Sequence, residues 1–310
     1  MQRLKADLLK RYYMPKLFVY DTDREFTTRI TLDFARGAVN YNNSVNGNWE
    51  VKHIPISNYL ENGLPNDLDP ETDAVATLGI LRGTGLMLKE AKSRDIDYYY
   101  IDHAYYNPGY KKKCWLRITK NAHACTTLKD VDSTKFNSYD QYHIENWRTN
   151  AQRGKKILVL PPTDAVGWFF DAKDWEHNTV AKIQQHMPDS KIVIRHKPKE
   201  PIVDERGFLI RLETGAESNP PLEQQLDDCF CVVAYNSMVA LQATLMGIPV
   251  IVNEHSCCTR VSFSFEDLAT PDVFNTEPQL REKLVWWLPH NQWKKTSIQD
   301  GTAWREINEC

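Results

Sequence analysis

The sequence predicts an α/β protein in which two parallel-sheet domains face a cleft. Short apolar runs alternate with helical stretches, and the turns between them are short. The runs are apolar without a polar alternation, as strands buried on both faces of a parallel sheet are. The chain has 310 residues, which matches two domains of roughly 150 residues each.

The composition is that of an ordinary globular protein, with 42% hydrophobic and 25% charged residues. It excludes a disordered chain, a collagen-like chain and a coiled coil. No apolar run approaches the roughly 18–20 residues that span a bilayer, and the charged start lacks a secretory signal, so we expect a cytoplasmic protein. The net charge of −3 excludes bulk attraction to nucleic acid but leaves room for a local basic groove.

Neither a metal nor a resident cofactor is expected. The seven cysteines form no CxxC pair, which favours reduced thiols over zinc or disulfides. Two carboxylates in an Asp-x-Asp triplet can chelate a hard cation, and four such triplets begin at Asp21, Asp67, Asp95 and Asp130. Short triplets arise by chance in a chain rich in Asp, so they are weak signals.

Apolar runs bounded by Pro, Gly and polar turns define the elements. The first half is expected to hold strands at 17–20, 76–81 and 98–101, helices at 24–35 and 86–94, and an Asn- and Gly-rich loop at 37–47. The second half is expected to hold strands at 157–160, 192–194, 229–234 and 250–252 and helices at 175–187, 222–226 and 238–246. A polar stretch at 130–154 separates the halves, and a helical tail begins at 277. This alternation is typical of Rossmann-like sheets.

Polar residues follow the predicted strands of the second half. They are Thr163 after 157–160, Arg195, His196 and Lys197 after 192–194, and Tyr235, Asn236 and Ser237 after 229–234. Ligands of parallel sheets bind at the carboxyl ends of the strands, so we expect these residues to form one site.

This site is suited to a nucleotide diphosphate. Arg195 and Lys197 would bind phosphates by forked donation and as a point charge, and His196 would donate to a phosphate or a sugar hydroxyl. Free N–H groups at the helix start after Tyr235 would add to the anion site. The alternatives are a solvated basic turn and a helix capped by Asn236 or Ser237.

The segments 157–162, 193–198 and 234–250 resemble the C-terminal domain of GT-B glycosyltransferases, especially the capsule-type and phosphosugar-type branches. The likeness lies in a basic strand end before Pro198 and in a Ser-containing helix start before the segment 243–251, whose sequence is ATLMGIPVI. The resemblance implies an acceptor-binding Rossmann-like domain at 1–150 and a domain at 151–280 that binds a nucleotide-diphosphate sugar, expected to be UDP-linked. Helices at 281–310 could pack back on the first domain.

Asp102 and His103 follow the predicted strand at 98–101. In inverting GT-B enzymes a carboxylate or His of the first domain deprotonates the acceptor hydroxyl, so the resemblance implies this role for Asp102 or His103. Such base catalysis contributes about 10²–10⁴-fold. The alternative is an Asp that caps the next turn beside an incidental His.

The run 98–106 and the preceding segment 79–83 also resemble proteins of bacteriophages and prophages, some of which decorate hydroxymethylated pyrimidines in DNA. This likeness implies double-stranded DNA with modified bases as the acceptor. A basic patch with interleaved aromatics suits nucleic acid, although a solvated face and core tyrosines are the alternatives. The expected acceptor-binding residues are Arg82, Gly83, Thr84, Tyr105, Tyr106, Lys111, Lys112, Lys113 and Arg117.

The leading hypothesis is therefore a glycosyltransferase that moves a sugar from a nucleotide-diphosphate sugar to a 5-hydroxymethyl pyrimidine in phage DNA. One alternative is the same chemistry on a surface polysaccharide or lipid-linked glycan. A second alternative is a non-catalytic nucleic-acid-binding protein.

Overall fold

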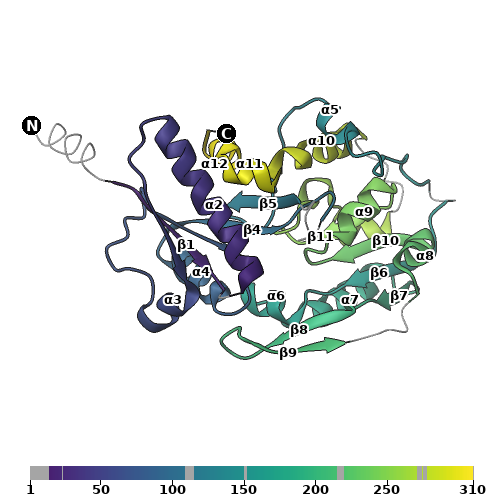
Figure 1. Ribbon diagram of the computed structural model, residues 1–310. Helices are drawn as coiled ribbons and strands as arrows, with labels where there is room; N and C mark the ends of the chain where they lie inside the picture. Colours follow the sequence, from purple (N-terminus) through teal and green to yellow (C-terminus); the bar gives the residue numbers. More distant parts are fainter. Residues whose placement is uncertain are drawn as a thin grey trace, which may run out of the picture. The chain divides into compact units, whose positions relative to one another are not determined.

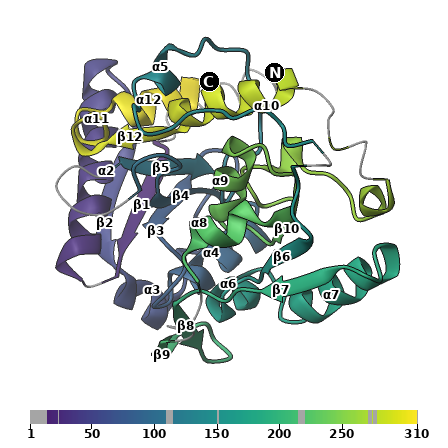
Figure 2. The same ribbon diagram turned by 90° about the vertical axis from the view of Figure 1, so that its right-hand side faces the viewer.

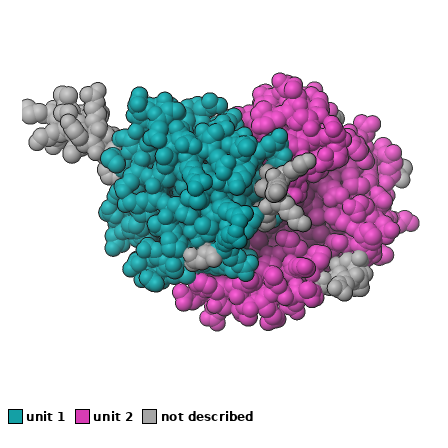
Figure 3. All heavy atoms as spheres, in the orientation of Figure 1, with its two compact units in different colours: residues 1–103, 109–121, 293–310 teal, residues 104–108, 122–292 magenta. Residues whose placement is uncertain are grey.

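The computed structural model describes residues 14–22, 24–108, 115–149, 152–214, 220–270, 274 and 278–309. The chain divides into two compact units, which Figure 3 colours separately. Unit 1 comprises residues 1–103, 109–121 and 293–310, and unit 2 comprises residues 104–108 and 122–292. Each unit contains its own sheet with parallel strands, so the predicted α/β class with two Rossmann-like sheets is confirmed. The chain enters unit 2 at residue 104 and again at residue 122, whereas the sequence predicts a boundary at 150.

Unit 1 is built on a six-stranded sheet in the order β12-β5-β4-β3-β1-β2 (Figures 1 and 2). β1 pairs in parallel with β2 and β3, and β4 pairs in parallel with β3 and antiparallel with β5. The three strands predicted in the first half are confirmed, and three more are present. The strands are β1 (Lys16–Asp21), β2 (Glu50–Pro55), β3 (Ala74–Leu78), β4 (Asp97–His103), β5 (Trp115–Lys120) and β12 (Gln292–Lys294).

Helix α2 (Glu25–Ser44) runs through most of the segment 37–47, so the loop predicted there is wrong. Gly37, which suggested a loop, instead has a packing role within the helix. A Cβ on Gly37 would lie 1.9 Å from the carbonyl oxygen of Ile298 in α11 (Lys295–Gln299). Gly37 therefore lets two helices approach closely, and Asn40 adds a side-chain hydrogen bond of 2.7 Å to the carbonyl oxygen of Gln299.

The tail of the chain completes the core of unit 1. Helix α12 (Thr302–Glu309) carries Trp304, whose ring centroid lies 5.6 Å from that of Phe34 and 4.9 Å from that of Tyr99. Trp293 and Ile298 join the same buried cluster. The sequence therefore predicts the helical character of this tail, and the contacts place residues 293–310 in unit 1. The remaining helices of the unit are α3 (Ile56–Asn62) and α4 (Thr84–Ser93).

Unit 2 is built on a four-stranded parallel sheet in the order β11-β10-β6-β7. All four strands predicted in the second half are confirmed: β6 (Lys156–Leu160), β7 (Lys191–Ile194), β10 (Cys229–Ala234) and β11 (Val250–Val252). β6 and β10 are buried along their whole length, which explains their unbroken apolar sequences. A separate hairpin of β8 (Lys199–Val203) and β9 (Leu209–Thr214) lies at the margin of the unit in Figure 1.

The helices of unit 2 connect these strands. The three helices predicted there are confirmed as α7 (Trp175–His186), α8 (Leu222–Asp227) and α9 (Val239–Leu245). Gly247 ends α9 in the left-handed region at φ 69°, as expected for a glycine that follows a helix. The other helices are α5 (Thr134–Asn137), α6 (Asp164–Phe169) and α10 (Pro278–Trp287).

Candidate functional site

The polar residues predicted in the second half lie along one edge of the unit 2 sheet. β6 lies between β7 and β10, and the three strands are parallel, so their carboxyl ends share an edge. The backbone N–H of Arg195 donates to the carbonyl oxygen of Val159 at 2.9 Å, and that of Tyr235 donates to Leu160 at 3.2 Å. The chain leaves β6 toward β7 on one side and continues with β10 on the other. The carboxyl ends of β6 and β10 are therefore the topological switch point, where ligands of such sheets bind.

At this switch point, two hydroxyl groups accept hydrogen bonds from backbone N–H groups at the starts of helices. Thr163 follows β6, and its Oγ1 accepts a hydrogen bond from the backbone N–H of Val166 at 3.4 Å. Ser237 follows β10, and its Oγ accepts from the N–H of Val239 at 3.3 Å. Both contacts use the hydroxyl oxygen as the acceptor. Thr163 is the N-cap of α6, whereas Ser237 lies one residue before Met238, the N-cap of α9. Each hydroxyl hydrogen is left to donate to a phosphate oxygen.

The three basic residues after β7 differ in what they contact. The Nη1 of Arg195 donates to the carbonyl oxygen of Pro220 and to Oε1 of Gln225, both at 2.8 Å, so this guanidinium holds the start of α8. The Nε2 of His196 lies 3.4 Å from a carboxylate oxygen of Glu176. Lys197 is exposed and makes no ion pair within the described part of the chain. Lys197 is therefore the cation that can face a diphosphate without breaking another contact.

Aromatic side chains lie near the switch point, and Tyr235 is the one among them that the sequence predicts as a site residue. Tyr235 is buried, and burial is the main cause that raises its pKa to about 12. Its ring lies 5.8 Å from that of Trp175, edge to face. His255 stacks on Phe170 with ring centroids 4.2 Å apart. His255 follows β11, so it also satisfies the criterion of a polar residue at the carboxyl end of a parallel strand.

In unit 1, Asp102 and His103 are the last residues of β4, as predicted. The Asp102 carboxylate accepts hydrogen bonds from the Tyr100 hydroxyl at 2.8 Å, the Arg117 Nη2 at 2.9 Å and the His103 backbone N–H at 2.7 Å. The Asp102 carboxylate is therefore engaged in an ion pair and two further hydrogen bonds at this strand end. His103 is half-buried and is the better candidate for a base at this strand end.

The predicted acceptor residues Arg82 and Gly83 lie in the turn between β3 and α4, and Thr84 is the first residue of α4. The hydroxyl of Thr84 donates to the carbonyl oxygens of Gly79 at 3.0 Å and Leu81 at 2.8 Å, which fixes the turn. Arg82 has φ 67° and Gly83 has φ 95°. This turn follows the strand next to β4, so it shares the carboxyl edge of the sheet with His103.

The other predicted acceptor residues do not form an exposed surface. Tyr105 and Tyr106 belong to unit 2 and are buried; the Tyr105 hydroxyl accepts from the N–H of Cys125 at 2.6 Å, and Tyr106 packs on Phe136. Arg117 is buried against Asp102. Lys111, Lys112 and Lys113 lie outside the described residues. The core alternative therefore fits both tyrosines better than a stacking surface does.

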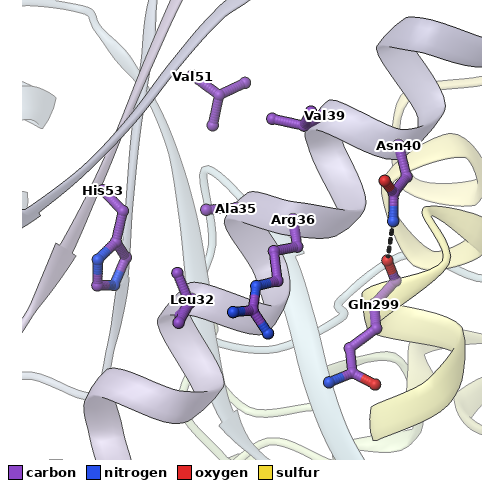
Figure 4. A pocket seen from close by; sticks show the side chains of 8 residues that line it. All are labelled: Leu32, Ala35, Arg36, Val39, Asn40, Val51, His53 and Gln299. Atoms are coloured by element: carbon purple, nitrogen blue, oxygen red, sulfur yellow. Dashed lines mark hydrogen bonds between the residues drawn. The ribbon is translucent and has the colours of Figure 1, made fainter.

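A cavity of about 490 Å³ lies elsewhere in unit 1, between α2 and the edge strand β2 (Figure 4). It contains none of the predicted site residues. His53 lines it, and burial lowers the pKa of this imidazole although the carboxylate of Asp21 lies 3.6 Å away. Its lining residues are Leu32, Ala35, Arg36, Val39, Asn40, Val51, His53 and Gln299.

The Asp-x-Asp triplets supply carboxylates to ion pairs. Asp97 lies 2.6 Å from Lys120, and Asp130 lies 2.7 Å from Lys283. Asp67 lies 2.6 Å from Lys16, whose hydrogen bond is the main cause that lowers the pKa of this carboxyl. In the described ranges, no group of three or more His, Cys, Asp or Glu residues is placed to hold a metal ion. No helix in the same ranges has the length and apolarity to cross a membrane.

Comparison with known proteins finds similar structures but no relative in sequence. No family model matches the chain, and no curated protein matches it. Two KpsC structures from Thermosulfurimonas dismutans are among the matches. The β-Kdo 2,7 transferase has 11% identity and a TM-score of 0.41, with 95% of this chain and 99% of that chain covered. The β-Kdo 2,4 transferase has 10% identity and a TM-score of 0.42, with 89% and 90% covered.

A third match is the glycotransferase of kitacinnamycin, at 8% identity and a TM-score of 0.24, with 96% of this chain and 97% of that chain covered. TM-scores below 0.5 do not establish a shared fold. The two-sheet architecture therefore rests on the strand pairing described above, and the site rests on its own geometry.

Proposed function

We propose that this protein is a glycosyltransferase that moves a sugar from a nucleotide-diphosphate sugar to a hydroxyl group of a carbohydrate acceptor. One observation carries the proposal: the polar residues after β6, β7 and β10 meet at the switch point of the unit 2 sheet. Hydroxyl donors, an uncommitted lysine and aromatic rings there suit the phosphates and the base of a nucleotide.

The residues take distinct roles in the proposed transfer. The acceptor oxygen attacks the anomeric carbon, the bond from that carbon to the diphosphate breaks, and the acceptor proton passes to His103. Lys197, Thr163 and Ser237 stabilise the charge that develops on the departing diphosphate. Asp102 fixes the end of β4 through the His103 amide and the Arg117 side chain.

The burial of three predicted DNA-binding residues favours a carbohydrate acceptor over DNA. Arg117, Tyr105 and Tyr106 are buried and cannot meet a duplex. A hydroxymethylated pyrimidine in phage DNA is therefore the second candidate acceptor.

Product analysis tests the proposal directly. The protein is incubated with UDP-linked sugars, together with either an oligosaccharide or a hydroxymethylated DNA duplex, and the products are weighed by mass spectrometry. We expect a mass gain of one sugar on the oligosaccharide. His103→Asn should lower turnover by about 10²–10⁴-fold while nucleotide affinity is kept, because only the base is lost.

Lys197→Ala provides the matching test of the nucleotide site. It should weaken binding of a nucleoside diphosphate in calorimetry, whereas Lys191→Ala, at the amino end of β7, should not. If sugar is transferred to the DNA duplex and not to the oligosaccharide, the carbohydrate acceptor is refuted and the hydroxymethylated pyrimidine takes its place. DNA binding without any nucleotide affinity would refute the enzyme and favour a non-catalytic nucleic-acid-binding protein.

A further inference from the structure

Two arginines flank the switch point of the unit 1 sheet. β1 lies between β2 and β3, and the chain goes from β1 to β2 on one side before it continues with β3 on the other. Arg24 follows β1 and Arg82 follows β3, so both lie where that order reverses. In parallel sheets this is the place where ligands bind.

Neither guanidinium has an acidic partner in the part of the chain that the structure describes. Burial, and next to it the positive charge of Arg24, lower the pKa of Arg82. The nearby carboxylate of Asp21 lies instead beside His53, at 3.6 Å. Two like charges near one another raise the free energy of both, and an anion between them would lower it.

The backbone around Arg82 is held in an unfavourable conformation. A non-glycine residue at φ 67° is uncommon, and such positions cluster at ligand sites. The two hydrogen bonds of Thr84 fix this turn. Beside it, a Cβ built on Gly79 would meet nothing within 4 Å, so the space over the end of β3 is open. Arg82 is thus fixed at the rim of an open strand end.

We propose that Arg24 and Arg82 bind a carboxylate or phosphate group of the acceptor, so that the acceptor is an acidic sugar or a sugar phosphate. This rests on the proposed function and deepens it. His103 ends β4, which is one strand from β3 and two strands from β1. Neighbouring strands lie about 5 Å apart, so the ends of β3 and β1 lie roughly 5 and 10 Å from the end of β4. One sugar residue spans that distance between a reacting hydroxyl and an anionic group.

Calorimetric titration with three small probes tests this site: glucuronate, glucose 6-phosphate and neutral glucose. We expect at least one of the two anions to bind at least tenfold more tightly than glucose. The preference should fall as ionic strength rises, and comparing the anions separates a carboxylate site from a phosphate site.

The variants separate charge from folding. Arg82→Gly removes the cation and tolerates φ 67°, so the fold is kept while the preference for anions is lost. Arg82→Lys keeps a cation but not the forked donors, and should retain part of the preference. Arg24→Ala should act like Arg82→Gly. Arg36→Ala, an exposed arginine further along α2, is the matched control and should bind like the wild type.

The outcomes distinguish this inference from the proposed function. If both anions bind no better than glucose, or if Arg82→Gly binds them unchanged, the anion site is refuted. If Arg82→Gly transfers sugar at the wild-type rate, the anion site is refuted and the proposed glycosyltransferase activity is supported. Anion binding that depends on Arg82, in a protein without nucleotide affinity, would support the anion site and refute the proposed function.

Discussion

The ion pair between Asp102 and Arg117 gives Arg117 a structural role that its position in the sequence does not predict. In the sequence, Arg117 stands near three lysines and predicts an exposed basic patch. In the structure it lies directly opposite Asp102 on the antiparallel strand, with 2.9 Å between Nη2 and Oδ2. Fifteen residues separate the two positions along the chain, so only the strand register brings them together.

Arg117→Met should destabilise the protein by about 3–5 kcal/mol, because it leaves the charge of Asp102 half-buried without its partner. Urea denaturation at neutral pH measures the loss. Adding Asp102→Asn removes that charge and should recover most of the stability. A double variant no more stable than Arg117→Met would contradict the assignment of the pair.

At the scale of elements, the apolar runs predict the strands well because burial on both faces leaves few polar residues in them. β6, β7, β10 and β11 appear where the sequence places them, and the polar residues after them therefore share an edge. Contacts between distant segments are what the sequence does not show. α2 continues through Gly37 because α11 packs on it, and β12 is three residues long and joins a strand far away in the chain.

Gly37→Ala is expected to destabilise the protein by about 1–3 kcal/mol, since the new methyl group would overlap the carbonyl group of Ile298. Glycine to alanine in a helix ordinarily stabilises by up to about 1 kcal/mol. Gly167→Ala is the matched control, because its Cβ would meet no atom closer than 3.7 Å within helix α6. Thermal unfolding measures both, and equal effects would contradict the close-packing role of Gly37.

At the scale of the whole molecule, unit 1 is assembled from segments that are far apart in the sequence. Residues 293–310 belong to it although they follow the whole of unit 2. Trp304 is buried against Phe34, Tyr99 and Trp49. The resemblance to GT-B glycosyltransferases implies such a return for 281–310, whereas hydrophobic periodicity alone does not indicate which core a terminal helix covers.

Trp304→Ala should therefore cost about 3–5 kcal/mol through the cavity it leaves. Amide hydrogen exchange should show lost protection in the strands of unit 1. Leu212→Ala, at a side chain that is 59% exposed, is the control and should change stability by less than about 0.5 kcal/mol. Protection lost only in unit 2 would show that the tail belongs to the other core.

The pairing of β12 with β5 also sets an order of events during protein synthesis. Lys120 and Gln292 are 172 residues apart in the chain (292 minus 120). At roughly 5–20 residues per second, a ribosome needs on the order of ten seconds or more to add them. Until then the outer edge of β5 lacks its last strand, so a nascent chain passes through a period in which that edge is open to other chains and to chaperones.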